Sequence, residues 1–365
     1  MVLPQSLSYY SIKRPQQVLA IYYQSPSAIN EVVALLPKSA LRELAAHGVS
    51  AAQWQIALRL LTTNNPQAAR LYWQPSFATY SRDQQISLVN ALYQQQQWQA
   101  LTYLAKLGLL PDGEVKQHWL LHQGAAVNQI TAQFAQQQQI ALSLTEHSAD
   151  KHCQYNVLML SDHRQGLMQL KAFKYTYSQK PEPAPNSFCF STPSYVAEQI
   201  NCFVTSQGAA SCDWLAASKT LRWPTDYDFI VMMPRHGRAN VSGGIMHINS
   251  ASHYNVFLHE LMHFSGFEDE YALAESKQQW LCKQQGYVAP NLFIARQLPP
   301  PIGWHQSIAC DSGVAYQPAK NWSIMRYMQI DLSAQYRTLW QQQINKPLTP
   351  HRRYTDYFLD LALAQ

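Results

Sequence analysis

The chain has 365 residues, about twice the length of an average domain, so the sequence predicts two domains. Hydrophobic residues make up 47% of the chain and charged residues only 13%, which is sufficient for a large buried core and excludes an intrinsically disordered protein. The formal net charge is +5, but lysine and arginine are scattered and form no basic run. The composition therefore excludes nucleic acid as a partner.

Nothing in the sequence predicts insertion into a membrane. No run of about 18 apolar residues occurs, so we expect no transmembrane segment. The opening residues MVLPQ do not have the pattern of a signal peptide, although removal of a leader before this numbering begins would leave the same start.

Cysteine usage indicates export. All six cysteines lie after residue 150, and none is part of a CxxC motif: Cys153, Cys189, Cys202, Cys212, Cys282 and Cys310. An even number confined to one part of the chain predicts up to three disulfides rather than a structural zinc site. We prefer one pair, Cys282 with Cys310, because these residues bracket a single loop. Disulfides predict a periplasmic or secreted protein, and the alternative is a cytosolic protein with six buried thiols.

Residues 1–135 are predicted to form an all-α domain. Apolar residues recur at spacings of three and four in residues 29–36, 54–61, 86–93 and 98–107. Ser81 and Asp83 are predicted caps for the third of these helices. Residues 88–107 have the two-helix pattern of a tetratricopeptide-like unit, so we expect a repeat-like or solenoid domain. Its role is open between packing against the next domain and docking a protein partner or a substrate.

Residues 140–365 are predicted to form a second domain of α+β class with a mixed twisted sheet. The pattern predicts strands at residues 154–160 and 228–233, and a helix at residues 165–177. Residues 244–250 alternate apolar and polar side chains, which favours an exposed or edge strand. We expect this strand to pair with an extended substrate and His247 to face solvent.

The strongest functional signal is the HExxH motif His259-Glu260-Leu261-Met262-His263, in a helix-compatible segment. On a helix, histidines four residues apart project from one face, where both ring nitrogens can bind one Zn²⁺ at about 2.0–2.1 Å. Glu260 cannot easily point at the same ion but can contact a water bound to it, which suits a general base. For the bare motif, the alternative is a surface helix that carries two histidines by chance.

Gly266 and Asp269 extend this motif to HExxHxxGxxD. A glycine three residues after the second histidine can adopt the left-handed conformation that ends a helix and turns the chain back. Asp269 then stands at the third-ligand position of the metzincin layout HExxHxxGxxH, so we predict that it completes a zinc site with the two histidines. Glu268 and Glu270 remain alternative third ligands.

Residues 321–328 read NWSIMRYM and contain a candidate methionine turn, the second half of the metzincin signature. Their Ser-Ile-Met-x-Tyr core is similar to the turn of astacin-type metzincins. This resemblance implies that Met325 forms an apolar floor beneath the histidines and that Tyr327 lies near the zinc, where its hydroxyl would hydrogen-bond the oxyanion. Ordinary core packing is the alternative for Met325.

The stretch from residue 227 to residue 271 resembles the IgA-peptidase-like metallopeptidases, a family of metzincin type. In that family a buried strand and a glycine-rich edge segment precede HExGHxxxxLxDEY, and here DFIVMM and VSGGIMH precede HELMHFSGFEDEY. The shared residues are His259, Glu260, His263, Asp269, Glu270 and Tyr271. Met262 replaces the family's glycine, and the spacer before Asp-Glu-Tyr is one residue shorter. The resemblance implies a metzincin-like zincin domain with an active-site helix, and it does not extend to residues 1–125.

Together these patterns predict a zinc-dependent endopeptidase that acts on a protein or peptide substrate. Glu260 is expected to be the general base, and Tyr327 is expected to stabilise the oxyanion. Two alternatives remain: a helical-repeat binding protein with a structural zinc site, and a zinc amidase that acts on cell-wall peptides. The intact Glu260 argues against the first of these, because a structural site has no use for a base.

Overall fold

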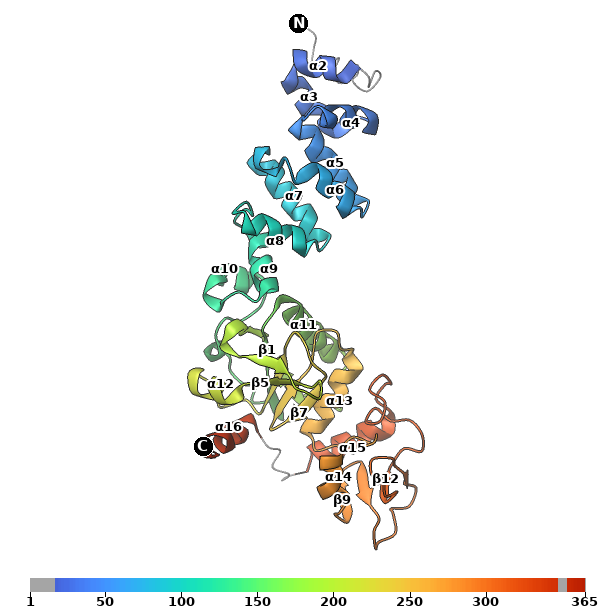
Figure 1. Cartoon of the computed structure of the whole chain (residues 1–365). Coiled ribbons are helices and arrows are strands. Elements are labelled where there is room, and N and C mark those ends of the chain that lie inside the picture. Colours follow the sequence, from blue (N-terminus) through green and yellow to red (C-terminus); the bar gives the residue numbers. More distant parts are fainter. Residues whose placement is uncertain (1–16, 347–352, 365) are drawn as a thin grey trace. The chain divides into compact units, whose positions relative to one another are not determined.

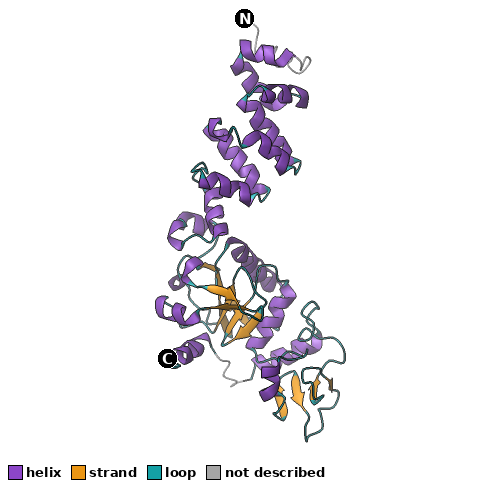
Figure 2. Cartoon of the chain, in the orientation of Figure 1, coloured by secondary structure: helices purple, strands orange, loops and turns teal. Residues whose placement is uncertain are grey.

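The computed structural model describes residues 17–346 and 353–364 (Figure 1). The chain divides into two compact units, residues 1–119 and residues 120–365. Every described strand lies in the second unit, whereas the first unit is built of helices (Figure 2). The protein is therefore of α+β class, as the sequence predicted.

The first unit is a succession of short helices packed mainly on helices close to them in sequence. These are α2 (Val18–Gln24), α3 (Pro26–Val32), α4 (Lys38–Ala46), α5 (Ser50–Thr62), α6 (Pro66–Trp73), α7 (Arg82–Gln94) and α8 (Trp98–Lys106). Their apolar faces fill two clusters, one around Leu41 and Leu44 and the other around Trp73 and Leu88. All four predicted helical segments are confirmed, the first of them ending in a 3-10 turn (Val33–Leu35).

Local hydrogen bonds explain where α7 begins. Ser81 Oγ accepts a bond from the Gln84 backbone N–H, and the Gln84 side chain accepts one from the Ser81 backbone N–H. This reciprocal capping box satisfies two donors that the helix itself cannot. The predicted cap at Ser81 is confirmed, while Asp83 lies in the first helical turn, where its negative charge suits the helix dipole.

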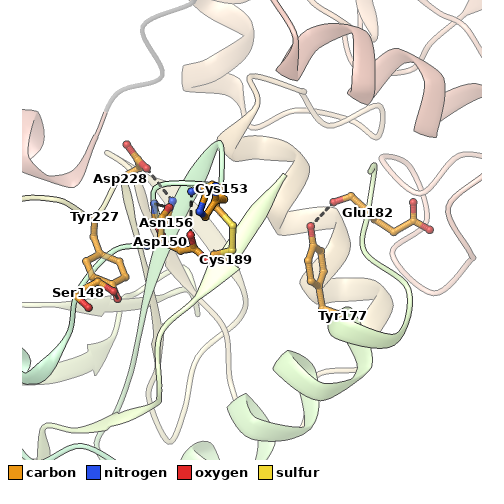
Figure 3. The surroundings of a disulfide bond; sticks show 10 residues. Ser148, Asp150, Cys153, Asn156, Tyr177, Glu182, Cys189, Tyr227 and Asp228 are labelled. Carbon is orange, nitrogen blue, oxygen red and sulfur yellow. Dashed lines mark hydrogen bonds between the residues drawn. A yellow bond between two sulfur atoms is a disulfide. The ribbon is translucent and has the colours of Figure 1, made fainter. Parts of the chain in front are cut away.

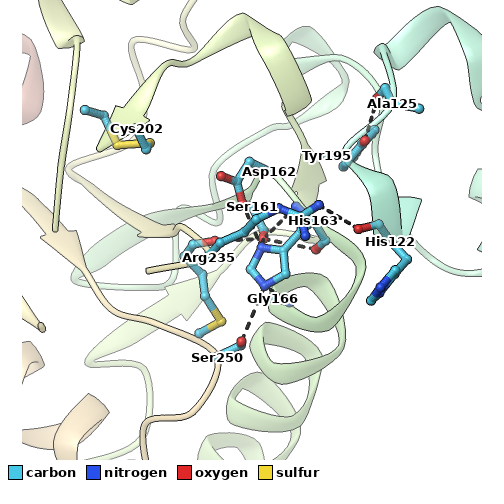
Figure 4. A network of polar contacts seen from close by, with 12 residues as sticks. His122, Ala125, Ser161, Asp162, His163, Gly166, Tyr195, Cys202, Arg235 and Ser250 are labelled. Carbon is cyan, nitrogen blue, oxygen red and sulfur yellow. Dashed lines mark hydrogen bonds and ion pairs between the residues drawn. A yellow bond between two sulfur atoms is a disulfide. The ribbon is translucent and has the colours of Figure 1, made fainter. Parts of the chain in front are cut away.

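Residues 120–137 belong to the second unit. Helix α9 (Glu114–Gln123) crosses the division, and α10 (Ala132–Gln137) packs in an apolar cluster that includes Tyr195. The Tyr195 hydroxyl also donates a hydrogen bond of 2.5 Å to the carbonyl of Ala125 (Figure 4). The second unit consequently starts before the boundary predicted near residue 135.

A six-stranded mixed sheet organises the second unit. Its strands are β1 (Tyr155–Ser161), β2 (Phe188–Phe190), β3 (Ser194–Tyr195), β6 (Phe229–Met233), β7 (Asn240–Ser242) and β8 (Ile245–His247). The order is β2-β1-β6-β8-β7, with β3 also paired to β1, and only the β7–β8 pair is antiparallel. The two predicted strands correspond to β1 and β6, and both are almost entirely buried, as expected for parallel strands covered on two faces.

Helices cover both faces of this sheet (Figure 1). Alternate residues of a strand point to opposite faces, so Val157 and Val231 pack on the layer of α11 (Arg164–Gln179), α13 (Tyr254–Phe264) and α15 (Ala334–Ile344). Leu158 and Ile230 pack on the other layer, α12 (Trp214–Thr220) and α16 (Tyr354–Leu363). Helix α11 confirms the helix predicted at residues 165–177.

The strand predicted at residues 244–250 is confirmed as β8, but the expectations that it is an exposed or edge strand and that His247 faces solvent are wrong. The strand β8 lies between β6 and β7, so β7 and not β8 is the edge of the sheet. A turn through Gly243 and Gly244, both with positive φ, folds the chain back into this hairpin. His247 is buried rather than solvent-facing: its Nε2 accepts a hydrogen bond of 3.0 Å from the Trp214 indole, and its Nδ1 lies 3.3 Å from Asn240 Oδ1.

Three disulfides use all six cysteines, as predicted. Cys153–Cys189 joins the segment before β1 to the neighbouring strand β2 (Figure 3). Cys202–Cys212 closes the hairpin of β4 (Cys202–Val204) and β5 (Ala210–Cys212). Cys282–Cys310 is the pair that the sequence favoured. Such bonds suggest an extracellular or otherwise oxidising location.

A second, smaller sheet follows α14 (Glu275–Leu281), and the Cys282–Cys310 bond closes the loop that contains its first three strands. Its strands, in the order β11-β12-β10-β9, are β9 (Gly286–Ala289), β10 (Leu292–Ile294), β11 (His305–Gln306) and β12 (Ala315–Gln317). No described helix combines the length and the apolar character that crossing a bilayer requires.

The buried imidazole of His247 makes the stability of the second unit depend on pH. Burial lowers the pKa of His247 from 6.5 to about 4, whereas the unfolded chain titrates near the ordinary value. Between these values the unfolded state binds the extra proton, so the free energy of unfolding decreases as the pH falls from 7 to 4, by about 3 kcal/mol from this residue. Urea unfolding at several pH values measures this. The His247→Gln variant should lose that part of the pH dependence, and an unchanged dependence would contradict the assignment.

Candidate metal centre

Helix α13 carries the HExxH motif and is anchored in the core. Phe257, Leu261 and Met262 are buried in the apolar cluster beside the sheet, which fixes the rotation of the helix about its axis. The helix ends at Gly266, whose φ of +78° is the left-handed conformation expected from the sequence. A hydrogen bond of 2.9 Å from the Gly266 N–H to the His263 carbonyl closes the last turn, and the chain then turns back towards the histidines.

Three ligand-type atoms converge beyond this turn. The Nε2 atoms of His259 and His263 are 3.2 Å apart, and each lies 3.2 Å from Oδ1 of Asp269. Ligand atoms that bind zinc tetrahedrally at about 2.0–2.1 Å are themselves about 3.3 Å apart, so this triangle has the size that a single zinc ion requires. The structure thus brings together all three residues predicted to bind the metal.

Backbone carbonyls orient both imidazoles. His259 Nδ1 lies 2.8 Å from the carbonyl of Ile324, and His263 Nδ1 lies 2.8 Å from the carbonyl of Phe267. A carbonyl can only accept, so each Nδ1 carries a proton, and in the neutral form of each ring Nε2 has a lone pair. This is the tautomer of metal-binding histidines, in which an outer hydrogen bond fixes the ring. Both lone pairs are therefore available at the centre of the triangle.

Asp269 completes an arrangement that needs a cation. Its Oδ1 is buried and has no hydrogen-bond donor when both Nε2 atoms are unprotonated. Burial opposes its charge, but contacts with His259 and His263 outweigh burial and hold the pKa of Asp269 well below its ordinary range. Protonation of His263 would also supply a positive charge. Burial disfavours the charged form of His263, but the contact with Asp269 outweighs burial and raises the pKa of this histidine to about 9. A divalent ion would satisfy all three atoms at once.

Glu260 adjoins this triangle without being part of it. Its carboxylate lies within 4.8 Å of the ligand nitrogens of His259 and His263, and only 2% of the residue is exposed. Burial raises the pKa of Glu260, an effect that the two histidines partly offset. The carboxyl group is therefore a stronger base than an exposed glutamate, as proton transfer near neutral pH requires.

The two alternative third ligands have other partners. Glu268 forms an ion pair with Lys277. Glu270 is fully buried, and its carboxylate accepts hydrogen bonds from Asn291, Ser323 and Tyr336. Its position in the motif therefore serves the packing around the site, and Asp269 is the only carboxylate of the three that contacts both histidines among the described residues.

The predicted methionine turn lies against the histidines. Residues 323–326 form a tight turn closed by a hydrogen bond of 3.1 Å from Arg326 N–H to the Ser323 carbonyl. Ile324, inside the turn, supplies the carbonyl that orients His259. Met325 is fully buried in the same apolar cluster as Leu261 and Met262, and its carbonyl accepts a bond of 3.0 Å from the Glu270 N–H.

Tyr271 lies beside the candidate metal ligand Asp269. The Tyr327 ring packs against Trp322, with ring centroids 4.9 Å apart, and no hydrogen bond joins it to the cluster in the part of the chain that the structure describes. The Tyr271 hydroxyl interacts with Asp269, and burial together with this carboxylate raises the pKa of Tyr271. The Asp-Glu-Tyr sequence was the only signal for Tyr271.

No protein-family model matches this chain. No curated protein matches it either. The chemistry of the centre is therefore inferred from its own residues.

Removal of the Asp269 charge tests the ligand set. Because Asp269 contacts both histidines, Asp269→Asn should lower zinc affinity by more than the roughly 10- to 100-fold that outer-shell changes cause. Zinc titration of the metal-free protein, with elemental analysis, measures this. Glu268→Gln is the matched control and should bind zinc like the parent protein. If Asp269→Asn retains zinc and Glu268→Gln loses it, the third ligand is Glu268 and the assignment of Asp269 is wrong.

Proposed function

We propose that this protein is a zinc-dependent peptidase that hydrolyses peptide bonds in protein or peptide substrates. One observation carries the proposal: three ligand atoms 3.2 Å apart, with a buried glutamate beside them. Two imidazoles and a carboxylate are a donor set that suits zinc, and three protein ligands leave one position open, as in catalytic rather than structural sites. When bound, zinc would make water a stronger nucleophile at neutral pH and polarise the carbonyl of the substrate.

Glu260 would move the proton. Its carboxylate would take a proton from the attacking water, hold it while the tetrahedral intermediate exists, and deliver it to the nitrogen of the leaving amine. Burial favours this proton transfer because it raises the pKa of Glu260. The difference in pKa between the carboxyl group and the water and amine with which it exchanges a proton is then smaller. His259 and His263 remain fixed by the Ile324 and Phe267 carbonyls throughout.

The finer assignments follow from the same residues. We propose a metzincin-type catalytic domain, from the HExxHxxGxxD motif and the turn that holds Met325. We propose a periplasmic or secreted location from the three disulfides. The first unit is proposed to be a solenoid-like surface that docks a protein partner.

Two other functions remain as outcomes of experiment. A binding protein with a structural zinc site would use all four coordination positions. It would not need a buried carboxylate beside the metal, so the buried Glu260 disfavours this alternative. A zinc amidase of cell-wall peptides would use the same centre. Digestion of a broad peptide library in parallel with purified peptidoglycan distinguishes the proposed peptidase from a zinc amidase.

The Glu260→Gln variant tests the proton-transfer role. Glutamine has nearly the same shape but cannot accept a proton, so zinc content should be unchanged while the rate of peptide hydrolysis falls by about 10²- to 10⁴-fold. Stopped assays on the library, with elemental analysis of the same samples, measure both quantities. Undiminished hydrolysis by the zinc-loaded variant would rule out Glu260 as the base.

A pair of phenylalanine variants separates the roles of the two tyrosines. Tyr271 interacts with Asp269, so Tyr271→Phe should weaken zinc binding by about 10- to 100-fold. Tyr327 is proposed to hydrogen-bond the oxyanion, so Tyr327→Phe should keep its zinc and lose about 10²-fold in kcat. Zinc titration and steady-state kinetics on both variants decide. Normal kinetics in Tyr327→Phe would remove this residue from the catalytic machinery.

A further inference from the structure

We propose that the cleft beside His263 is a substrate subsite that selects a bulky apolar side chain, and that the small sheet, three of whose strands lie within the loop closed by the Cys282–Cys310 bond, forms its selective wall. The inference rests on the proposed peptidase function, since it names the class of peptide that the same centre would cleave. Three observations support it: the residues that line the cleft, the exposed Tyr287 ring beside the partly buried Trp304, and the charges around them.

The cleft is large, and His263 of the metal centre is among the residues that line it. Its volume is about 880 Å³, within the range of pockets that hold several groups of a ligand. Most of its lining comes from the β7–β8 turn, the end of α13 with His263, the β9 hairpin and the region at the end of α15, and Phe229, Lys277 and Trp304 complete it. A peptide that lies across His263 therefore has a side-chain site within reach.

Aromatic rings dominate the wall on the small sheet. Tyr287 on β9 is 65% exposed and makes an edge-to-face contact with Trp304, with ring centroids 5.4 Å apart. Phe293, on β10, supports the Tyr287 ring at 5.1 Å. Rings held in this way but left open to water gain from contact with another apolar group, so they favour an aromatic or large aliphatic side chain.

The charges of the lining exclude a basic side chain. Glu268 is the only carboxylate among the described residues that line the cleft, and it already forms an ion pair with Lys277. Lys346, also in the lining, donates a hydrogen bond of 2.9 Å to Gln343 and has no carboxylate partner among the described ion pairs. A lysine or arginine side chain of the substrate would meet positive charge and no unpaired carboxylate among the described lining residues. An uncharged side chain would not experience this repulsion.

The wall is fixed relative to the metal ligands. Asn291, in the two-residue turn between β9 and β10, accepts a hydrogen bond of 2.9 Å from the Glu268 N–H and donates one of 2.7 Å to the Glu268 carbonyl. Asp269 is the next residue. A side chain bound against Tyr287 would consequently hold the adjacent peptide bond at a constant position relative to Asp269 and the histidines.

Binding and cleavage of one peptide series test this subsite. Otherwise identical fluorescent peptides carry Phe, Leu, Ala or Lys at the variable position. Fluorescence anisotropy measures their binding to zinc-loaded Glu260→Gln, and cleavage is measured with the parent protein. Phe and Leu peptides should bind and be cleaved about tenfold or more better than Ala, and Lys should be the poorest.

Two aromatic substitutions and one control locate the effect. Tyr287→Ala and Trp304→Ala should each remove most of the preference for Phe over Ala while zinc content stays unchanged. Trp280→Ala removes an exposed tryptophan on α14 that does not line the cleft, and it should leave the preference intact.

The outcomes separate the subsite from the peptidase function. Cleavage without preference, or a preference that survives both cleft substitutions, overturns the subsite and leaves the function standing. If the zinc-loaded parent cleaves nothing, the peptidase proposal fails. The anisotropy series then still decides the subsite, because selective binding of Phe peptides that is lost in Tyr287→Ala supports it and indifferent binding overturns it.

Discussion

Three electron-pair donors held 3.2 Å apart, two imidazole nitrogens and one carboxylate oxygen, are the constraint on which the centre of the second unit depends. Burying a carboxylate beside two lone pairs is unfavourable unless a cation joins them. The fold nevertheless enforces the arrangement, because carbonyls of Ile324 and Phe267 lock both rings and the turn at Gly266 returns the chain to them. The zinc ion that we propose would offset this cost.

A second buried carboxylate explains how segments far apart in sequence keep this geometry. Glu270 receives hydrogen bonds from Asn291 in the small sheet, Ser323 at the methionine turn and Tyr336 on α15. Burial raises the pKa of Glu270 because it penalises the charged carboxylate. The three hydrogen bonds partly offset this effect, because they stabilise the charge. The residue next to the third ligand therefore joins three elements, and the sequence marked it only as an alternative ligand.

The sequence predicted what local spacing determines. Two histidines one helical turn apart, a glycine that must be left-handed and a carboxylate at a fixed distance beyond it are local relations, and the structure has all of them. The buried strands β1 and β6 were equally readable, because a strand covered on both faces is apolar throughout. The edge strand β7 was missed, since three residues of mixed polarity carry no periodic signal. Asn291 and Tyr336 were missed for a different reason: their role is a contact with a distant residue.

The small sheet illustrates how a weak element can still serve a precise site. Its strands have only two to four residues, too few to form a stable core alone, and its own apolar cluster is small. The Cys282–Cys310 bond joins residues 28 positions apart. It lowers the conformational entropy of the unfolded chain and thereby stabilises the fold by about 3–4 kcal/mol. Asn291 then fastens the sheet to the ligand loop. Because these two attachments hold the sheet, Tyr287 can stay exposed on its surface against the partly buried Trp304. Both residues line the cleft and can define what it accepts without disturbing the core that holds the histidines.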